Sequence, residues 1–307
     1  MLALQSYVTG YLHPDYIRSL SEFGEPVLLP RSGGWLLKRA IDRAATDAMG
    51  TYPLFACSDW RSLSTDFDEV CRSLVSIVVV TDPFGEYDEP LLHNSFDLVI
   101  PFKSHFVRDL NCSQGNAMCE HHVRNTRIGL KRVNVELCEN PSSGLEDWIK
   151  LYSILIHRHR ISGIRAFSAS SFAVQLRIPG IVCFRALREK ETVGMTLWYL
   201  QNGIAYYHLG AYSDEGYRLR ASFALFSRAF DYFASCRLKY VNLGAGAGLD
   251  DHADDGLTRF KRGWSTVLRQ TYLCGRIVDR TKYDHLVRTR EIGATDYFPA
   301  YRKGEFS

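Results

Sequence analysis

The sequence predicts an α+β protein in which mixed, mostly antiparallel sheets are flanked by helices. Three apolar stretches joined by the short turns 188–191 and 201–203 have the pattern of an antiparallel meander: 182–187, 192–200 and 204–209. A helical stretch and two more strand-like stretches follow, at 219–236, 239–243 and 266–278. A helix that connects two strands allows parallel pairing, so the sheet is expected to be mixed.

The composition is that of an ordinary globular protein. Of the 307 residues, 46% are hydrophobic and 23% are charged, which argues against a disordered chain and provides for one large domain or two of usual size. The formal net charge of +3 is only mildly basic. It argues against a dedicated nucleic-acid-binding protein, so DNA is not expected as a partner, but it is consistent with a local basic patch.

Cysteine usage and hydropathy indicate a reducing compartment. The eight cysteines form no Cys-x-x-Cys pair, and Cys183 and Cys274 lie inside apolar patterns, so we expect buried free thiols and no disulfide framework. No standard zinc motif has the spacing of Cys112, Cys119, His121 and His122, and no metal is expected. The N-terminus lacks the features of a signal peptide, and no apolar run approaches about 18 residues. We therefore expect a cytoplasmic protein without a membrane span.

The first hundred residues predict alternating helices and strands. A helix is expected to begin at Pro14 or Asp15 and to end at Gly24, because proline suits the first turn of a helix and glycine its end. Strands at 27–29 and 34–41 flank the hairpin signal Arg31-Ser-Gly-Gly. The further elements expected here are a third strand at 54–57, a helix at 65–74, a buried strand at 75–80 and a strand at 98–102.

Residues 111–120 are small and polar and mark the expected domain boundary. They divide the chain into an N-terminal domain, 1–110, a second domain, 111–285, and a tail, 286–307. The elements expected early in the second domain are a helix at 121–132, a strand at 133–138, an amphipathic helix at 145–160 and a short helix that Ser168 caps and Leu176 ends.

The helix expected at 121–132 contains no acidic residue. Its spacing of i, i+3 and i+7 places three cations on one face: Arg124, Arg127 and Lys131. This stripe is either a solvated face or a contact for a polyanion, and the residues alone favour neither interpretation.

A basic and aromatic segment, Gly256-Leu-Thr-Arg-Phe-Lys-Arg-Gly-Trp264, lies between the strands expected at 239–243 and 266–274. It contains three cations within four residues: Arg259, Lys261 and Arg262. One interpretation is a solvated turn that joins two adjacent strands. The other is a site in which the two strands hold one lysine at the mouth of a sheet.

The glycine-rich loop before this segment, 244–248, superficially matches a nucleotide-binding loop. A dinucleotide fingerprint needs a helix that starts within the loop, and here four acids follow that would repel a pyrophosphate: Asp250, Asp251, Asp254 and Asp255. We interpret the stretch as a flexible loop, with metal binding by these acids and His252 as a lesser alternative.

Several stretches of the C-terminal half together resemble the Gcn5-related N-acetyltransferase (GNAT) superfamily, and more specifically its FemXAB branch, whose members carry two GNAT domains in tandem. They are the basic segment 124–132, the meander 182–209 with the helix after it, Asn242-Leu-Gly-Ala-Gly, and the segment 256–264. The last is the most specific, because the family shows a similar Phe-Lys-x-Gly-aromatic pattern at this place. The resemblance covers residues 110–285 well and the first hundred loosely, and it implies tandem GNAT-like domains.

The resemblance implies transfer of an aminoacyl or acyl group to an amine, and it places Phe260 and Lys261 beside the reacting carbonyl. The chemistry of the residues agrees, because attack by an amine builds negative charge on the carbonyl oxygen and a fixed cation stabilises that charge. We therefore expect Lys261 to stabilise the oxyanion and Phe260 to shape the wall of the site. The alternative is a non-catalytic binding module that keeps the fold and recognises a peptide or sugar precursor.

The attacking amine must be neutral, so a general base is useful. His208 is one candidate; by strand alternation it shares a face with Tyr206, although a lone histidine on a strand is more often structural. Asp82 is another, because it resembles an aspartate before proline in the first domain of the family. A simple Asx turn before Pro83 explains it at least as well.

The loop after Leu209 bears on the donor. Acyl-CoA enzymes of the superfamily carry Arg/Gln-x-x-Gly-x-Gly/Ala there, whose N–H groups hold the pyrophosphate. This chain has one glycine, Gly216, with Arg218, Arg220 and two acids. The departure argues against coenzyme A and suits aminoacyl-tRNA, whose phosphates would meet Arg218, Arg220, Arg124 and Arg127. The small net charge argues the other way, so aminoacyl-tRNA and acyl-CoA both remain as co-substrates. No tightly bound cofactor is expected, and the acceptor is a small-molecule or peptide amine.

Overall fold

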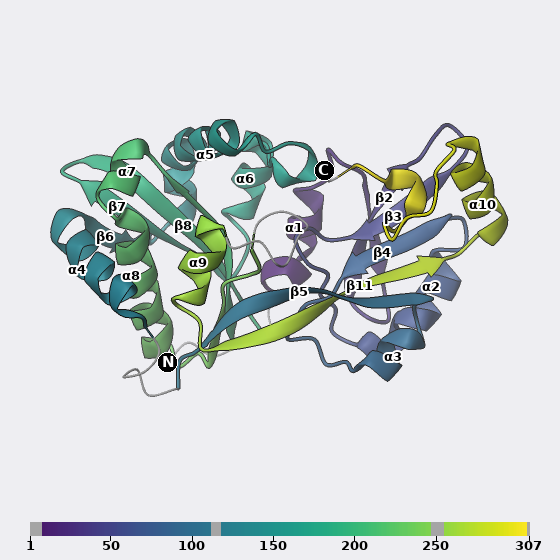
Figure 1. Cartoon of the computed structure of the whole chain (residues 1–307), viewed down its shortest axis with the longest axis horizontal. Coiled ribbons are helices and arrows are strands. Elements are labelled where there is room, and N and C mark those ends of the chain that lie inside the picture. Colours follow the sequence, from purple (N-terminus) through teal and green to yellow (C-terminus); the bar gives the residue numbers. More distant parts are fainter. Residues whose placement is uncertain (1–7, 112–117, 247–254, 306–307) are drawn as a thin grey trace. The chain divides into compact units, whose positions relative to one another are not determined.

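The computed structural model describes residues 8–111, 118–246 and 255–305. The chain forms two compact units, each built from two separate stretches (Figure 1). Unit 1 comprises Met1–His13 and Ser104–Arg269, and unit 2 comprises Pro14–Lys103 and Gln270–Ser307. Strands β5 (Leu98–Asp109) and β11 (Val267–Ile277) each contribute residues to both units. The division at 110 and 285 and the tandem arrangement of GNAT-like domains stay predictions.

Unit 1 is built on a mixed, mostly antiparallel sheet with the strand order β5-β10-β9-β8-β7-β6. Strand β10 (Tyr240–Asn242) is antiparallel to β5 and parallel to β9 (Ile204–Tyr212). Antiparallel pairing continues through β8 (Glu191–Gln201), β7 (Ile181–Arg188) and β6 (Asn134–Leu137). The meander expected between 182 and 209 is thereby confirmed.

Helices cover both faces of this sheet, because successive residues of its strands point to opposite sides. On one face, Trp198 of β8 packs against α8 (Ala221–Ser235), which lies beside α4 (Glu120–Arg132). On the other face, the hydroxyl of Tyr199 donates a hydrogen bond to the main chain of α6 (Ala169–Gln175), and α5 (Leu145–His159) contacts β8 and β9. Two short helices, α7 (Asp214–Arg218) and α9 (Gly256–Arg262), complete the helices described in the unit.

The sequence located three of these helices well. The helices expected at 121–132 and 145–160 are α4 and α5, and the hydroxyl of Ser168 caps α6 by accepting a hydrogen bond from Ser171 N at 3.1 Å. Phe167 packs against Phe172 of the same helix with ring centroids 5.7 Å apart. Capping residues and apolar periodicity therefore predicted these elements correctly.

In unit 2 the order of the strands is β1-β2-β3-β4-β11. The strands are β1 (Glu25–Leu29), β2 (Gly34–Ala40), β3 (Thr46–Gly50) and β4 (Ser76–Val80), with β3 and β4 parallel and the other neighbours antiparallel. Its helices are α1 (Pro14–Arg18), α2 (Leu63–Val70), α3 (Glu89–His93) and α10 (Arg280–Thr289). The hairpin β1–β2 and the buried strand β4 confirm the expectations for these segments.

Two expectations for unit 2 are wrong. The helix expected to reach Gly24 ends at Arg18, and residues 54–57 form only an isolated bridge, Phe55 with Thr81. The third strand is β3 instead, whose sequence Thr-Asp-Ala-Met-Gly has little preference for strand. Pairing with β2 on one side and β4 on the other makes it a strand, and that context is invisible in the local sequence.

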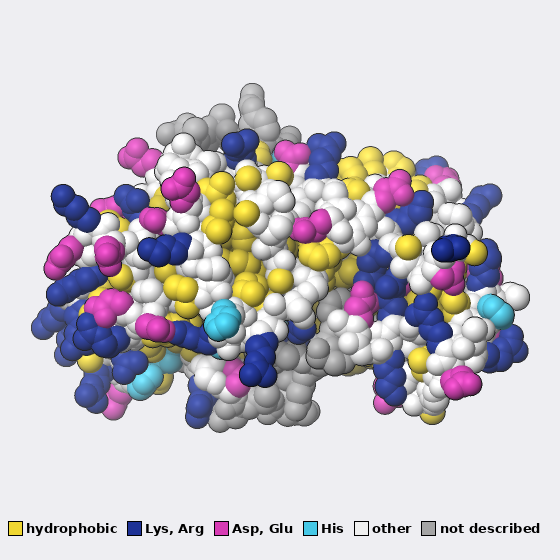
Figure 2. Space-filling view, turned by 90° about the horizontal axis from the view of Figure 1, so that it is seen from above, with side chains coloured by type: hydrophobic (Ala, Val, Ile, Leu, Met, Phe, Trp, Pro, Cys, Tyr) yellow, Lys and Arg dark blue, Asp and Glu magenta, His cyan; other side chains and the backbone are white. Residues whose placement is uncertain are grey.

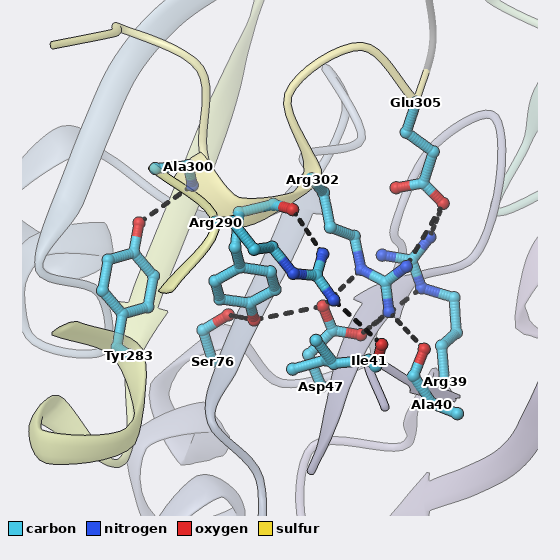
Figure 3. A network of polar contacts seen from close by, with 11 residues as sticks. Arg39, Ala40, Ile41, Asp47, Ser76, Tyr283, Arg290, Ala300, Arg302 and Glu305 are labelled. Carbon is cyan, nitrogen blue, oxygen red and sulfur yellow. Dashed lines mark hydrogen bonds and ion pairs between the residues drawn. The ribbon is translucent and has the colours of Figure 1, made fainter. Parts of the chain in front are cut away.

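Asp47, buried on β3, ties the end of the chain to unit 2 (Figure 3). Its carboxylate accepts hydrogen bonds from Arg302 at 2.6 and 2.8 Å and from the Tyr301 hydroxyl at 3.1 Å, while Arg39 donates to Glu305 at 2.5 Å. A buried carboxylate is tolerated where cations and donors surround it. Residues of the expected tail are therefore packed against the sheet of unit 2.

Within the ranges that the structure describes, no helix combines the length and the apolar character needed to cross a lipid bilayer.

Candidate active site

Strand β10 is parallel to β9 over its whole length, and β9 continues beyond the end of β10. They pair from Ile204 and Tyr240 to Tyr206 and Asn242. Beyond that point the chain after β10 follows β5, since Leu243 N donates to Phe106 O at 2.8 Å and Phe106 N to Gly244 O at 3.0 Å. Strand β9 meanwhile continues along β8 as far as Tyr212. We call the place where the two strands part, around Tyr207 and Ala245, the strand divergence.

Helix α9 brings Lys261 to the strand divergence. The side chain is buried, with 6% of its surface exposed. Its Nζ donates to the carbonyl of Ala245 at 2.7 Å and lies 5.7 Å from the centre of the Tyr207 ring. Both contacts favour the ammonium form, because a carbonyl dipole and the face of an aromatic ring attract a cation. Lys261 is therefore fixed inside the fold, as the second interpretation of this segment required.

The segment around Lys261 is nevertheless a helix and not a turn between adjacent strands. Asp255 caps it, because its carboxylate accepts from Leu257 N at 2.6 Å and from Thr258 N at 2.9 Å. The strands on either side of the segment are also not neighbours, since β5 and β9 flank β10. Both parts of the expectation are thus corrected.

Phe260 lies in an aromatic cluster and only partly meets solvent. Its ring packs edge-on against Phe223 and Phe226 of α8, with centroids 5.0 and 4.8 Å apart, and its main-chain carbonyl lies 2.9 Å from Nε2 of His122 on α4. These contacts fix α9 against α8 and α4. Phe260 thus helps to hold the helix that positions Lys261, and its role as a wall of the site stays a prediction.

His208 points to the opposite face of the sheet from Lys261. Lys261 contacts Tyr207, whereas His208 packs among Tyr11, Tyr199 and Gln175. Its Nε2 donates to Gln175 Oε1 and its Nδ1 accepts from the Tyr11 hydroxyl, both at 3.2 Å. Burial lowers the pKa of His208 to about 3, so the ring is neutral at pH 7. The structure does not bring it together with Lys261, and its contacts are those of a structural histidine.

Asp82 belongs to unit 2 and follows β4. It is buried, and its Oδ1 accepts from Phe84 N at 3.0 Å, while its carbonyl accepts from Gly85 N at 3.0 Å and from the Tyr87 hydroxyl at 2.9 Å. This is the Asx turn considered as the simpler explanation. A catalytic role of Asp82 stays a prediction.

Gly216 packs too closely for any larger residue. A Cβ built on it would lie 2.0 Å from the carbonyl oxygen of Val193 on β8. Its N–H donates to the Ser213 hydroxyl, which caps α7, at 3.1 Å. Gly216 thus joins α7 to the sheet. This close packing by itself explains a glycine here, and a role in donor binding stays a prediction.

The arginines expected to meet the donor are exposed. Arg218 pairs with Glu215, with Nη2 2.6 Å from Oε1, and Arg220 precedes α8 with a left-handed backbone. Arg124 and Arg127 lie on the exposed side of α4, opposite Asn125, which is buried. Figure 2 shows Lys and Arg side chains gathered where α4 and α7 lie in Figure 1, on the left in both views. Unit 1 therefore presents exposed arginines on α4, at the end of α7 and at the start of α8, with acidic side chains among them.

Sequence reasoning missed two contributors to the strand divergence. The Tyr207 ring and the Ala245 carbonyl hold Lys261, and neither residue type signals such a role by itself. The cap of α9 was detectable, because an aspartate followed three residues later by threonine at the start of a basic segment is a capping pattern. Of the residues weighed for metal binding, Asp250, Asp251, His252, Asp254 and Cys112 lie outside the described residues.

Comparisons with known proteins find similarity of structure only. No protein-family model matches the chain, and no curated protein matches its sequence. The C-terminal domain of a protein described as a lysylphosphatidylglycerol synthetase, from Agrobacterium fabrum, superposes with a TM-score of 0.64 at 12% identity and covers 92% of each chain. FemX superposes with a TM-score of 0.61 at 13% identity, covering 89% of this chain and 93% of its own. L-PGS from Bacillus licheniformis gives 0.58 at 14% identity, covering 94% of this chain and 100% of its own.

These likenesses extend over nearly the whole chain at very low sequence identity, so they show the fold and not the substrate. The expected mostly antiparallel sheets flanked by helices are thereby confirmed, in a fold that is similar to those of FemX and of the lysylphosphatidylglycerol synthetase domain.

Proposed function

We propose that the chain is an N-acyltransferase that transfers an aminoacyl or acyl group to an amine and forms an amide. The observation that carries the proposal is the buried ammonium group of Lys261 at the strand divergence. Burying a cation costs free energy, and a protein keeps one in such a place where the charge has a use. The fold, which FemX and the lysylphosphatidylglycerol synthetase domain share, supports the same reaction class.

In the proposed reaction the donor carbonyl enters the strand divergence with its oxygen toward Lys261. The neutral amine attacks the carbonyl carbon, the negative charge on the oxygen is stabilised by Nζ, and the bond to the leaving oxygen or sulfur then breaks. Loss of one such hydrogen-bond donor typically lowers the rate by about 10²–10³. His208 faces the other side of the sheet, so we propose that another group, or water, takes the proton of the amine.

Two donors fit the proposal. Aminoacyl-tRNA suits the exposed cations of α4, of the end of α7 and of the start of α8, which would contact its phosphates: Arg124, Arg127, Arg218 and Arg220. Acyl-CoA would place its pyrophosphate near the first turn of α8. Binding of tRNA, and so transfer from it, should weaken steeply as the salt concentration rises. Each counterion released from the tRNA makes the affinity depend more strongly on salt.

The test compares Lys261→Met with Arg259→Met, which removes an exposed cation from the same helix. Labelled acetyl-CoA and labelled aminoacyl-tRNA are each offered with a panel of small-molecule and peptide amines, and mass spectrometry of co-purified ligands guides the choice of acceptor. Lys261→Met is expected to lower transfer by about 10²–10³, and Arg259→Met to leave it nearly unchanged. Transfer that survives Lys261→Met would reject this site, and ligand binding without transfer would favour a non-catalytic binding module.

A further inference from the structure

The first turn of α4 holds an exposed thiol against a buried imidazole. Cys119 is the N-cap residue of this helix and is exposed, while His122, three residues later, has only 3% of its surface exposed. The Sγ of Cys119 lies 3.0 Å from Nδ1 of His122. A nucleophile and a base within hydrogen-bonding distance are the first requirement of an activated nucleophile.

The second ring nitrogen determines where the protons lie. Nε2 of His122 is 2.9 Å from the Phe260 carbonyl, which can only accept, so Nε2 carries the hydrogen. In the neutral ring Nδ1 then presents its lone pair to Cys119, and the thiol donates to it. The Phe260 carbonyl thus orients the base toward the nucleophile, as the third member of a catalytic triad does.

The ring of His122 is held firmly in this position. Phe223 and Trp264 each pack edge-on against it with centroids 5.1 Å away. Gly263 leaves the room that the ring needs, because a Cβ built there would lie 2.0 Å from Cε1. The three elements α4, α8 and α9 therefore all contribute to the placement of one imidazole.

His122 is in the protonation state that a base needs. Burial is the main cause that lowers the pKa of His122, so the ring is neutral and able to accept a proton at pH 7. Its Nε2 faces a carbonyl in the last turn of α9, and the Cys119 sulfur lies at the N-terminus of α4.

The start of α4 also supplies donors for an oxyanion. The N–H groups of His122 and Val123 turn back to the Cys119 carbonyl at 2.9 and 3.2 Å. The preceding N–H groups, those of Glu120 and His121, belong to the first turn, whose N–H groups have no partner within a helix. Paired main-chain N–H groups beside a nucleophile are the usual means of stabilising a tetrahedral intermediate.

We propose that Cys119 is an acyl-accepting nucleophile, with His122 as its base and the Phe260 carbonyl as the group that orients the base. The ligand class is an activated acyl ester or thioester, a choice that rests on the proposed function. The Cys119 proton passes to Nδ1, the sulfur bonds to the acyl carbon, and the bond to the leaving oxygen or sulfur breaks. The leaving group takes the proton from His122, and a thioester remains on Cys119. An amine or water then attacks the thioester and restores the thiol.

The test uses p-nitrophenyl acetate with the full chain and follows acetylation of each cysteine by peptide mass spectrometry. Cys236 is the internal control, because it is also exposed but lies beside the Tyr232 phenol and not an imidazole. Cys119 is expected to be acetylated at least about 10-fold faster than Cys236, in keeping with general-base assistance of about 10²–10⁴. His122→Gln keeps a side-chain donor for the Phe260 carbonyl but removes the base, and it should bring Cys119 to the rate of Cys236.

Equal rates at Cys119 and Cys236 in the unaltered protein would overturn the proposal, and so would an undiminished rate in folded His122→Gln. If that variant does not fold, the comparison within the unaltered protein decides. Transfer to an amine, which Lys261→Met tests, is measured separately from acetylation of Cys119. Failure of the Cys119 site is thereby distinguished from failure of the proposed transferase site.

Discussion

A buried histidine lies on each face of the sheet in unit 1: His208 on one and His122 on the other. They differ in the group that donates a hydrogen bond to the ring. His208 accepts from the phenol of Tyr11, which is itself buried, and donates to Gln175 within the same interior cluster. His122 accepts from the thiol of Cys119, which is exposed, and donates to a helix carbonyl.

Burial lowers the pKa of both rings, so a perturbed pKa does not separate the two. The group that each ring faces does separate them. A thiol ordinarily ionises near pH 8.5, and the one beside His122 is exposed to solvent. A phenol ordinarily ionises near pH 10, and the one beside His208 is buried. The comparison teaches that a histidine suited to chemistry is recognised by the acidity and exposure of the group that it faces.

The largest expected effect is on stability, at the interior histidine. His208→Ala removes a packed ring and leaves the Tyr11 hydroxyl and the Gln175 amide without this partner, so we expect a loss of about 3–5 kcal/mol in the free energy of unfolding. Urea denaturation measures it, with His157→Ala, an exposed histidine of α5, as a control expected within about 0.5 kcal/mol. The acetylation rate of Cys119 should not change while the variant is folded. A loss below about 1 kcal/mol would contradict the structural role.

A second variant tests the packing around His122 on the other face and leaves Cys119 and His122 unchanged. Gly263→Ala adds a methyl group where the His122 ring lies, and the resulting overpacking should cost about 1–3 kcal/mol. Because the ring must move, Cys119 should also lose its advantage over Cys236 in acetylation. Gly256→Ala, at the first residue of the helix that Gly263 caps at its other end, is the matched control, since a Cβ there meets nothing within 4 Å. If both variants react alike, the packing of His122 does not control the thiol.

Local pattern predicted much of the fold. The strands of the meander are apolar stretches that end at turn residues, and α4, α5 and α6 show helical periodicity or a cap. What failed were segments whose structure depends on distant partners. Strand β3 exists because β2 and β4 pair with it, and α9 forms where the basic residues alone favoured a turn.

The candidate sites depend even more on contacts between distant residues. The resemblance singled out Lys261, but only the fold shows that its ammonium group is buried against Ala245 and Tyr207, since lysine is usually exposed. The spacing of Cys119 and His122 is visible in the sequence, yet the carbonyl that orients the ring comes from 138 residues away. The phenol that engages His208 is 197 residues away, so strand alternation could place that histidine on a face but not identify its partner.

The smallest expected effect sharpens the comparison through pH. His208 has a pKa of about 3 in the folded chain, lowered by burial, against about 6.5 in an unfolded chain. As the pH falls below about 6.5 the unfolded chain binds this proton first, so stability that is present above that pH is lost progressively toward pH 3. Between pH 7 and pH 5 the loss from this one group is about 2 kcal/mol. The phenols packed against the ring, Tyr11 and Tyr199, stay neutral throughout this range and do not obscure it.

The measurement is urea denaturation of the unaltered protein and of His208→Gln at both pH values. His122 also has a lowered pKa and titrates in the same direction, but it is present in both proteins and cancels in the comparison. The difference in stability between the two proteins should therefore shrink by about 2 kcal/mol on going from pH 7 to pH 5. If the stabilities of the two proteins changed in parallel with pH, His208 would be protonated in the folded chain. It would then not be the neutral interior histidine that the comparison with His122 requires.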